Sequence, residues 1–172
     1  MDYLKYYFLE DYLFKEVKNN FKKRGYLTTE EFFCIIIWKS NRAKTAIERK
    51  LLKFGNLKTV VKKLTSEIFH MSGTEQKLEL LIKSWKFNLP MATTILTVLY
   101  PQEFTIYDMR VRGQIGICND FSGRKDQIKR YFDEFLPKVK RLGKGKNLRN
   151  KDRYLWGKSF YQDLMKLLKR VN

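Results

Sequence analysis

The sequence predicts an all-α protein, a compact helical domain of about eight to nine helices. Apolar residues recur every three to four positions along most of the 172-residue chain, and no stretch alternates polar and apolar residues as a strand would. Hydrophobic residues make up 44% of the chain, enough for a core, and no Pro/Gly/Ser-rich linker divides it. We therefore expect a single domain over residues 1–172, either undivided or folded as two helical lobes.

The N-terminal half is expected to form a series of amphipathic helices. Apolar spacing predicts a first helix over 2–23, which Gly25 ends. Thr28 and Glu31 form a capping box, which predicts a helix that continues to Trp38. The same reasoning predicts helices over 43–54, 57–69 and 74–85, with Gly55 as a stop and Thr74 as a cap.

The C-terminal half contains a tight turn, an apolar helix and a basic region. Pro90 suits the first turn of a helix over 90–99, because its missing N–H has no helical partner there. Residues 104–107 are apolar and expected to be extended, and Asp108 can cap the helix that follows. The basic region 124–172 is expected to contain helices over 124–142, from Asn147 to Trp156, and a last one to Val171, with the Gly143–Lys146 loop between the first two.

Charge gives the clearest indication of a partner. The chain has 36 Lys and Arg against 18 Asp and Glu, a net charge of +18 and a pI near 9.9. Such an excess favours a polyanion, first of all double-stranded DNA, because each neutralised phosphate releases counterions. RNA and a solvated basic surface are the alternatives. The densest basic run, Lys138 to Arg153, contains the candidate phosphate contacts Lys144, Lys146 and Arg149.

Several classes of protein are disfavoured. Two cysteines without a CxxC motif and the single histidine His70 argue against a metal site, an iron–sulfur cluster and a catalytic triad. No signal peptide is visible, and the longest apolar run, 32–38, is too short to span a bilayer. We therefore expect a cytoplasmic, nucleoid-associated monomer with no membrane partner and no cofactor.

The most informative stretch runs from Trp85 to Leu96 and is followed by Asp108. A short turn between two helices can direct several backbone N–H groups at one phosphate. The candidate DNA contacts in this turn are Lys86, Phe87, Asn88, Leu89 and Met91. The ring of Phe87 has two alternatives, exposure as a wedge or packing between the helices.

This layout resembles the helix-hairpin-helix DNA glycosylase superfamily, over roughly residues 28–118 with the hairpin motif at about 74–100. When the Ala of the superfamily hairpin is aligned with Ala92, Lys86 and Asn88 stand on its two glycines. Asn tolerates the backbone of a tight turn, whereas Lys does not do so readily. The sixteen-residue separation of Ala92 and Asp108 equals that in endonuclease III-like members.

A second resemblance rests on three short motifs. They are Trp38-Lys39-x-x-Arg42, Tyr100-Pro101 followed by Tyr107-Asp108-x-Arg110, and Leu148-Arg149-x-x-Asp152-x-x-Leu155-Trp156. This combination looks like a group of small bacterial and archaeal proteins that are distantly related to the glycosylases and usually have no assigned activity.

The superfamily resemblance implies a base-excision glycosylase in which Asp108 stabilises the oxocarbenium-like sugar or activates water. The two usual Schiff-base lysine positions hold Pro90 and Glu79, which implies a monofunctional enzyme unless Lys83 or Lys86 has taken the role. The alternative is a DNA-binding helix-hairpin-helix protein without catalysis. From the residues alone, Asp108 could be a plain helix cap.

Nearby cations complete the set of candidate site residues. Arg110 and Arg112 follow Asp108 closely, and Arg42 is a candidate partner for its carboxylate from a distance. Arg42 could equally contact phosphate or be solvated. Lys39, Arg42, Arg110 and Arg112 are also candidate DNA contacts.

Overall fold

The computed structural model describes residues 3–171. It confirms the predicted class, since 74% of the chain is helical and residues 3–171 contain no strand. The elements are α1 (Leu4–Tyr7), α2 (Leu9–Tyr12), a π-helical turn (Leu13–Val17), α3 (Lys18–Arg24), α4 (Thr29–Ser40), a 3₁₀ turn (Asn41–Ala43), α5 (Lys44–Leu52), α6 (Leu57–His70), α7 (Thr74–Glu79), a π-helical turn (Leu80–Ser84), α8 (Leu89–Leu99), α9 (Met109–Gln114), α10 (Gln127–Arg130), a π-helical turn (Tyr131–Phe135), α11 (Leu136–Leu142) and α12 (Leu148–Val171). If each uninterrupted helical run is counted once and α1 is included, the described residues form nine helices.

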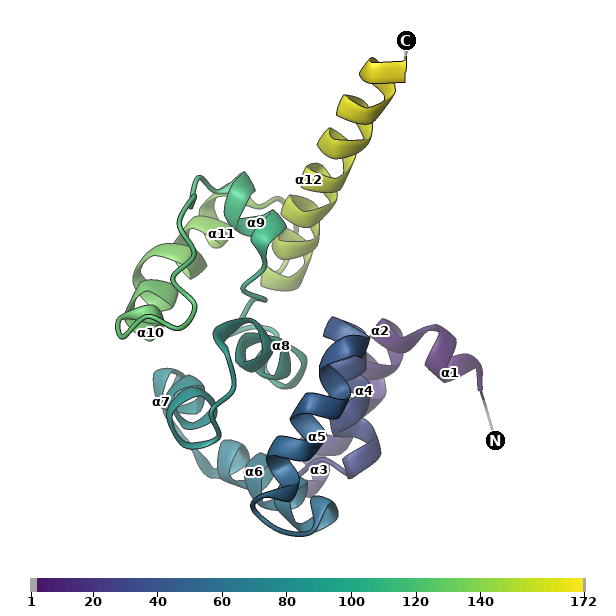
Figure 1. Cartoon of the computed structure of the whole chain (residues 1–172), viewed down its shortest axis with the longest axis vertical. Helices are drawn as coiled ribbons and strands as arrows, with labels where there is room; N and C mark the ends of the chain where they lie inside the picture. Colours follow the sequence, from purple (N-terminus) through teal and green to yellow (C-terminus); the bar gives the residue numbers. More distant parts are fainter. Residues whose placement is uncertain (1–2, 172) are drawn as a thin grey trace.

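Helix α8 is the centre of the core. All of its residues except Pro90 are buried, and it packs against α3, α4 and α7. In Figure 1 the helices α2 to α6 lie on one side of α8, and α9 to α12 lie on the other. The C-terminal half of α12 extends away from the rest of the molecule (Figure 1). A continuously apolar helix such as α8 needs neighbours on every side, which explains this central position.

Most predicted helix ends are confirmed. Gly25 ends α3 with a left-handed φ of 77°, and Thr28 and Glu31 form both hydrogen bonds of the capping box. The predicted cap Thr74 is wrong, because Gly73 occupies the cap position of α7. The Thr74 hydroxyl instead donates to Glu103, 2.8 Å away. A side chain that can cap is diverted here by an acceptor from a distant part of the chain.

Other boundaries differ from the prediction. The first helix is interrupted at Phe8 (φ −91°, ψ 48°), where both Leu4 and Phe8 are exposed. Apolar spacing continues through this stretch, but spacing alone does not reveal whether another element covers the apolar face. The predicted break after Trp156 is also absent, and α12 continues through Gly157 to Val171. One glycine costs a helix only about 1 kcal/mol, and the helix-forming residues that follow Gly157 compensate for it.

The helix that contains Pro137 begins at Gln127 rather than at residue 124. Pro137 lies in the first turn of α11, directly after the π-helical turn Tyr131–Phe135. A proline inside a helix lacks its own N–H and clashes with the carbonyl four residues earlier. The wider π turn relieves this conflict, so the run from 127 to 142 stays continuous.

Candidate functional site

The position of Asp108 depends on a return of the chain along α8. The segment 104–107 is extended and buried, and the Tyr107 N–H donates to Thr93 Oγ1 at 3.0 Å. Thr93 lies four residues after Leu89, about 6 Å along the helix axis. The chain that leaves the C-terminal end of α8 therefore comes back towards its N-terminal end. Asp108 and the hairpin lie at the same end of α8.

The hairpin between the π-helical turn and α8 has a left-handed residue. Lys86 has a φ of +55°, and no other described residue apart from glycines has a positive φ. Asn88 caps α8 by accepting a hydrogen bond from the Met91 N–H at 3.0 Å. Lys50 of α5 stabilises the turn. Its Nζ donates to the Lys86 carbonyl at 3.2 Å and lies 3.5 Å from the Phe87 ring centroid. Burial lowers the pKa of Lys50 to about 8.

Only part of the hairpin is accessible to a ligand. Phe87, Leu89 and Met91 are buried, so their side chains are core and not contact groups. The ring of Phe87 packs against Phe32, which is the packing alternative of the two considered above. Lys86 and Asn88 are exposed. A phosphate at this turn could meet the Lys86 side chain and backbone N–H groups.

A pocket of about 410 Å³ contains Asp108. It is lined by Glu10, Trp38, Lys39, Ile106, Asp108, Arg149, Asp152, Arg153 and Trp156. These residues come from α2, α4, the segment before α9, and α12. Each of the three short motifs of the second resemblance contributes at least one of them. Glu10, Trp38, Ile106, Asp152, Arg153 and Trp156 were not among the candidate site residues from the sequence.

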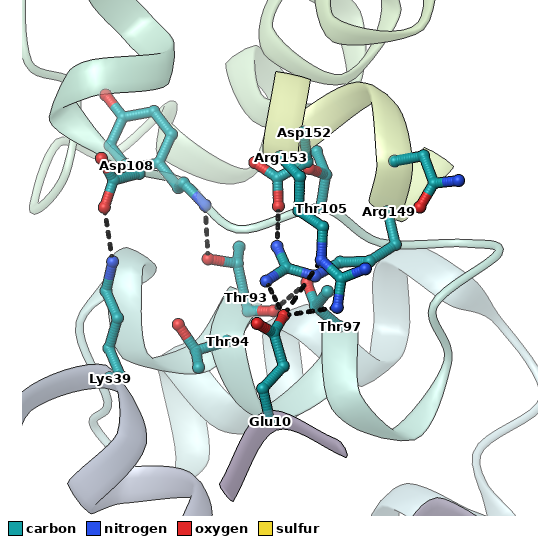
Figure 2. Close-up of polar contacts among 12 residues, drawn as sticks. Glu10, Lys39, Thr93, Thr94, Thr97, Thr105, Asp108, Arg149, Asp152 and Arg153 are labelled. Atoms are coloured by element: carbon teal, nitrogen blue, oxygen red, sulfur yellow. Dashed lines mark hydrogen bonds and ion pairs between the residues drawn. The ribbon is translucent and has the colours of Figure 1, made fainter. Parts of the chain in front are cut away.

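Asp108 is held on both carboxylate oxygens. Its Oδ1 accepts the Arg110 N–H at 2.9 Å and so caps α9. Its Oδ2 accepts a hydrogen bond from Lys39 Nζ at 2.7 Å (Figure 2). The two side chains of this ion pair are 19% and 22% exposed, so a molecule in the pocket can reach them. The partner of Asp108 is thus Lys39, whereas Arg42 is exposed in the 3₁₀ turn after α4.

A second group of charges occupies the other side of the pocket (Figure 2). The Arg149 guanidinium donates to both Asp152 and Glu10, and Arg153 Nη2 lies 2.9 Å from Glu10 Oε1. Arg149 also lies against the rings of Trp38 and Phe14, at 5.3 and 5.1 Å. This network connects α12 to α2 and α4 and fixes that wall of the pocket.

The acidic residues of this network differ in proton affinity. Burial raises the pKa of Asp152 to about 6, although the Arg149 charge opposes the shift; the negative charge of Asp108 adds to it. Burial also acts against the charged form of Glu10, but hydrogen bonds and charges from Arg149 and Arg153 outweigh it and lower the pKa of Glu10. Asp152 therefore holds a proton more readily than an ordinary aspartate, and Glu10 less readily.

The remaining candidates lie outside the pocket. Arg112 is 8% exposed, with its guanidinium 5.5 Å from the Tyr107 ring and 3.6 Å from Asp120, so it cannot contact DNA as it lies. Arg110 pairs with Asp163 at 2.6 Å. Lys144 and Lys146 are exposed in the loop that precedes α12.

Within residues 3–171, no helix is long and apolar enough to cross a membrane. No group of His, Cys, Asp and Glu side chains in this range is arranged to hold a metal ion. The chain matches no protein family, no curated protein and no solved structure.

Proposed function

We propose that this protein binds DNA and hydrolyses the N-glycosidic bond of a damaged or mismatched nucleotide that is extruded into the Asp108 pocket. The observation that supports the proposal is a carboxylate held on both oxygens at the edge of a pocket of about 410 Å³. Pockets of 300–1,000 Å³ are typical of small-molecule sites, so one extruded nucleoside fits. Enzymes that act on a base remove it from the stack in this way.

The side chains of the pocket suit this reaction. As the N-glycosidic bond breaks, positive charge develops on the sugar, and the Asp108 carboxylate stabilises it or activates water. Lys39 holds that carboxylate in one orientation. Trp38 offers an aromatic ring for the base in the pocket. Asp152, with its raised pKa, supplies a carboxyl group that can donate a proton to the leaving base.

DNA binding is supported by the distribution of positive charge. Arg153 lines the pocket and is about half exposed, and Lys144 and Lys146 are exposed in the adjacent loop. Arg149, a candidate phosphate contact from the sequence, instead donates to Asp152 and Glu10 and belongs to the pocket wall. Lys86 is exposed on the hairpin, at the same end of α8 as Asp108. With a net charge of +18, these groups can contact phosphates on either side of an extruded nucleotide.

A non-catalytic DNA-binding protein is the second candidate. The observation in its favour is that both oxygens of Asp108 are already engaged, one by the α9 cap and one by Lys39. An aspartate with only these two partners is sufficient as a structural residue. The two candidates share their DNA contacts and differ only in chemistry.

The experiment that separates them is base release from a panel of duplexes, each with one damaged or mismatched base. Asp108→Asn should lower release from the best substrate by roughly 100-fold or more, on the order expected for one preorganised electrostatic group. Asn is also a good helix cap, so the variant should fold and bind DNA normally. Asp126→Asn, at an exposed aspartate with no side-chain cap bond, is the matched control.

Two outcomes would contradict this assignment. Release that is undiminished in Asp108→Asn would make Asp108 a cap only. Release of no base by the wild-type protein, with duplex binding intact, would favour the non-catalytic DNA-binding protein.

A further inference from the structure

Two aromatic side chains of α12 are exposed beside the pocket. Trp156 and Phe160 are one helical turn apart, and their rings are parallel to within 7° with centroids 5.8 Å apart. Their residues are 44% and 51% exposed. Large aromatic side chains that are about half exposed are energetically costly in water and are typical of binding surfaces.

The two rings lie at the edge of the contact between α12 and α9. Polar residues make its contacts with α9, since Gln162 accepts from Gln114 at 2.6 Å and Asp163 accepts from Arg110 at 2.6 Å. In a helix, residues 156, 160 and 163 share one face, and residue 162 is turned away from that face. Trp156 and Phe160 therefore lie on the side of α12 that is next to Arg110 of α9, and about half of each residue remains exposed to solvent.

A fixed cation accompanies the rings. The Arg110 guanidinium lies 5.5 Å from the Trp156 ring centroid and 5.9 Å from that of Phe160. Its Nη1 is held by Asp163 at 2.6 Å and by Ser159 Oγ at 3.5 Å. Planar aromatic rings combined with an arginine are the groups on which nucleobases stack, and the cation attracts the attached phosphates.

The rings are continuous with the pocket. Trp156 itself lines the pocket that contains Asp108, and Phe160 is one turn farther along α12. A strand whose nucleotide enters the pocket would bring its next nucleotide to these rings. At this place the rings can receive a base only if that base is unpaired.

We propose that Trp156 and Phe160, together with Arg110, form a stacking site for an unpaired nucleobase next to the nucleotide in the pocket. The inference rests on the proposed function and adds the class of substrate: DNA that is single-stranded or locally unpaired, in preference to continuous duplex. The stacking site contributes affinity without reading sequence, because every base has a π-face.

The test measures binding of the full chain to a 12-nucleotide oligothymidylate and to a 12-base-pair duplex at the same salt concentration. Trp156→Ala and Phe160→Ala should each weaken oligothymidylate binding by roughly 5- to 100-fold, the loss expected for one stacked base. Duplex binding, which depends on phosphate contacts, should change by less than about 2-fold. Trp156 is the most exposed tryptophan, so binding of oligothymidylate should quench the fluorescence of the wild-type protein.

Three further variants separate stacking from other roles. Trp156→Phe should retain most of the affinity because it keeps a flat ring, whereas Trp156→Leu should lose it although it keeps apolar area. Leu168→Ala is the matched control, on the same exposed helix but two turns beyond Phe160, and should bind as the wild type does. Thermal melting of each variant checks that it folds.

Each outcome has one meaning. Unchanged oligothymidylate binding by both Trp156→Ala and Phe160→Ala, with Asp108-dependent base release by the wild-type protein, overturns the stacking site and leaves the proposed function standing. Equal losses for Trp156→Leu, Trp156→Ala and Leu168→Ala would identify an apolar docking face and overturn the stacking site. Tighter binding of an oligouridylate of equal length would overturn the assignment to DNA. Binding to neither DNA would overturn both proposals.

Discussion

Lys39 and Asp108 form an ion pair of 2.7 Å across 69 positions of the sequence. Lys39 lies in the last turn of α4, and Asp108 precedes the first residue of α9. The pair therefore joins two helices that lie on opposite sides of α8 (Figure 1). It also places an ammonium group directly beside the carboxylate of the proposed reaction. This lysine comes from α4, whereas the two usual Schiff-base positions hold Pro90 and Glu79.

Replacing Lys39 should reduce base release. Lys39→Gln removes the charge that orients Asp108 Oδ2, and small misplacements of a reacting group can cost about 100-fold, so we expect release to fall roughly 10- to 100-fold. Borohydride should trap no covalent adduct with the wild-type protein, since the proposed reaction is monofunctional. Single-turnover base release and a denaturing gel measure the two effects. An adduct that disappears in Lys39→Gln would instead identify Lys39 as a Schiff-base lysine.

Asp152 should make folding stability depend on pH. An aspartate in an unfolded chain has a pKa of about 3.9, and burial raises that of Asp152 to about 6. The folded protein thus binds the proton more tightly, so this contribution to stability is complete below pH 4 and is lost as the pH rises through 6. The shift corresponds to roughly 3 kcal/mol, an order-of-magnitude figure.

Urea unfolding of the wild-type protein and Asp152→Asn at pH 4, 5, 6 and 7 checks this contribution. Asparagine has nearly the same shape and does not titrate. Between pH 4 and 7, the wild-type protein should lose stability relative to the variant by about the amount above. The quantity compared is the change in the free energy of unfolding with pH. The absolute values are not compared, because loss of the Arg149 ion pair changes the stability of the variant equally at all four pH values. If the free energies of unfolding of the two proteins change with pH in parallel, Asp152 stays charged in the folded protein between pH 4 and 7.

Lys86→Gly should stabilise the protein. The φ of +55° at Lys86 is unfavourable for residues with a Cβ atom and is open to glycine. We expect the free energy of unfolding to rise by about 0.5–1 kcal/mol, measured by urea unfolding. Lys86→Ala loses the same charge but keeps the Cβ atom, so it is the control. If glycine is no more stable than alanine at this position, the left-handed conformation is not strained.

Duplex DNA binding should weaken steeply with salt. About five to eight phosphate contacts correspond to a log–log slope of roughly −4 to −7. Replacing Lys144 and Lys146 together by glutamine should make the slope shallower by roughly 2, since each lysine that contacts phosphate contributes about one unit. Lys15→Gln is the control, because Asp11 already balances that charge at 2.9 Å. Affinity that is constant between low and moderate salt would exclude a phosphate-based interface.

Local features of the sequence were sufficient to predict where most helices begin and end. Gly25, the Thr28–Glu31 capping box and the Asp108 cap act within four residues of the chain, and the structure confirms each. Thr74 failed as a cap because its hydroxyl bonds to Glu103, 29 positions away. A capping rule describes a side chain and its own helix, and it cannot anticipate a competing acceptor from elsewhere.

Some residues of the candidate site could be found from local sequence, and others could be found only from the fold. Asp108 could be selected from the sequence because its spacing from the hairpin is a property of one continuous segment. Lys39 was selected from the sequence only as a DNA contact. Asp152 and Trp156 belong to one of the three short motifs, but the sequence assigned neither of them a role. Their convergence on one pocket is produced by α4 and α12, which are separated by more than 100 residues. A sequence pattern carries no information about which distant segments meet.

Four properties follow from the order of the amino acids alone: the helical class, most helix caps, the excess of positive charge and the position of Asp108 one residue before a helix. Each depends on composition or on neighbours within a few residues, where the chemistry of the side chains is sufficient. Other properties follow only from the folded arrangement: Lys39 pairs with Asp108, Phe87 is core, Asp152 is buried, and Trp156 and Phe160 stay about half exposed. These properties depend on the packing of distant helices around α8, because burial and partnership are set by whichever segments surround a side chain in space.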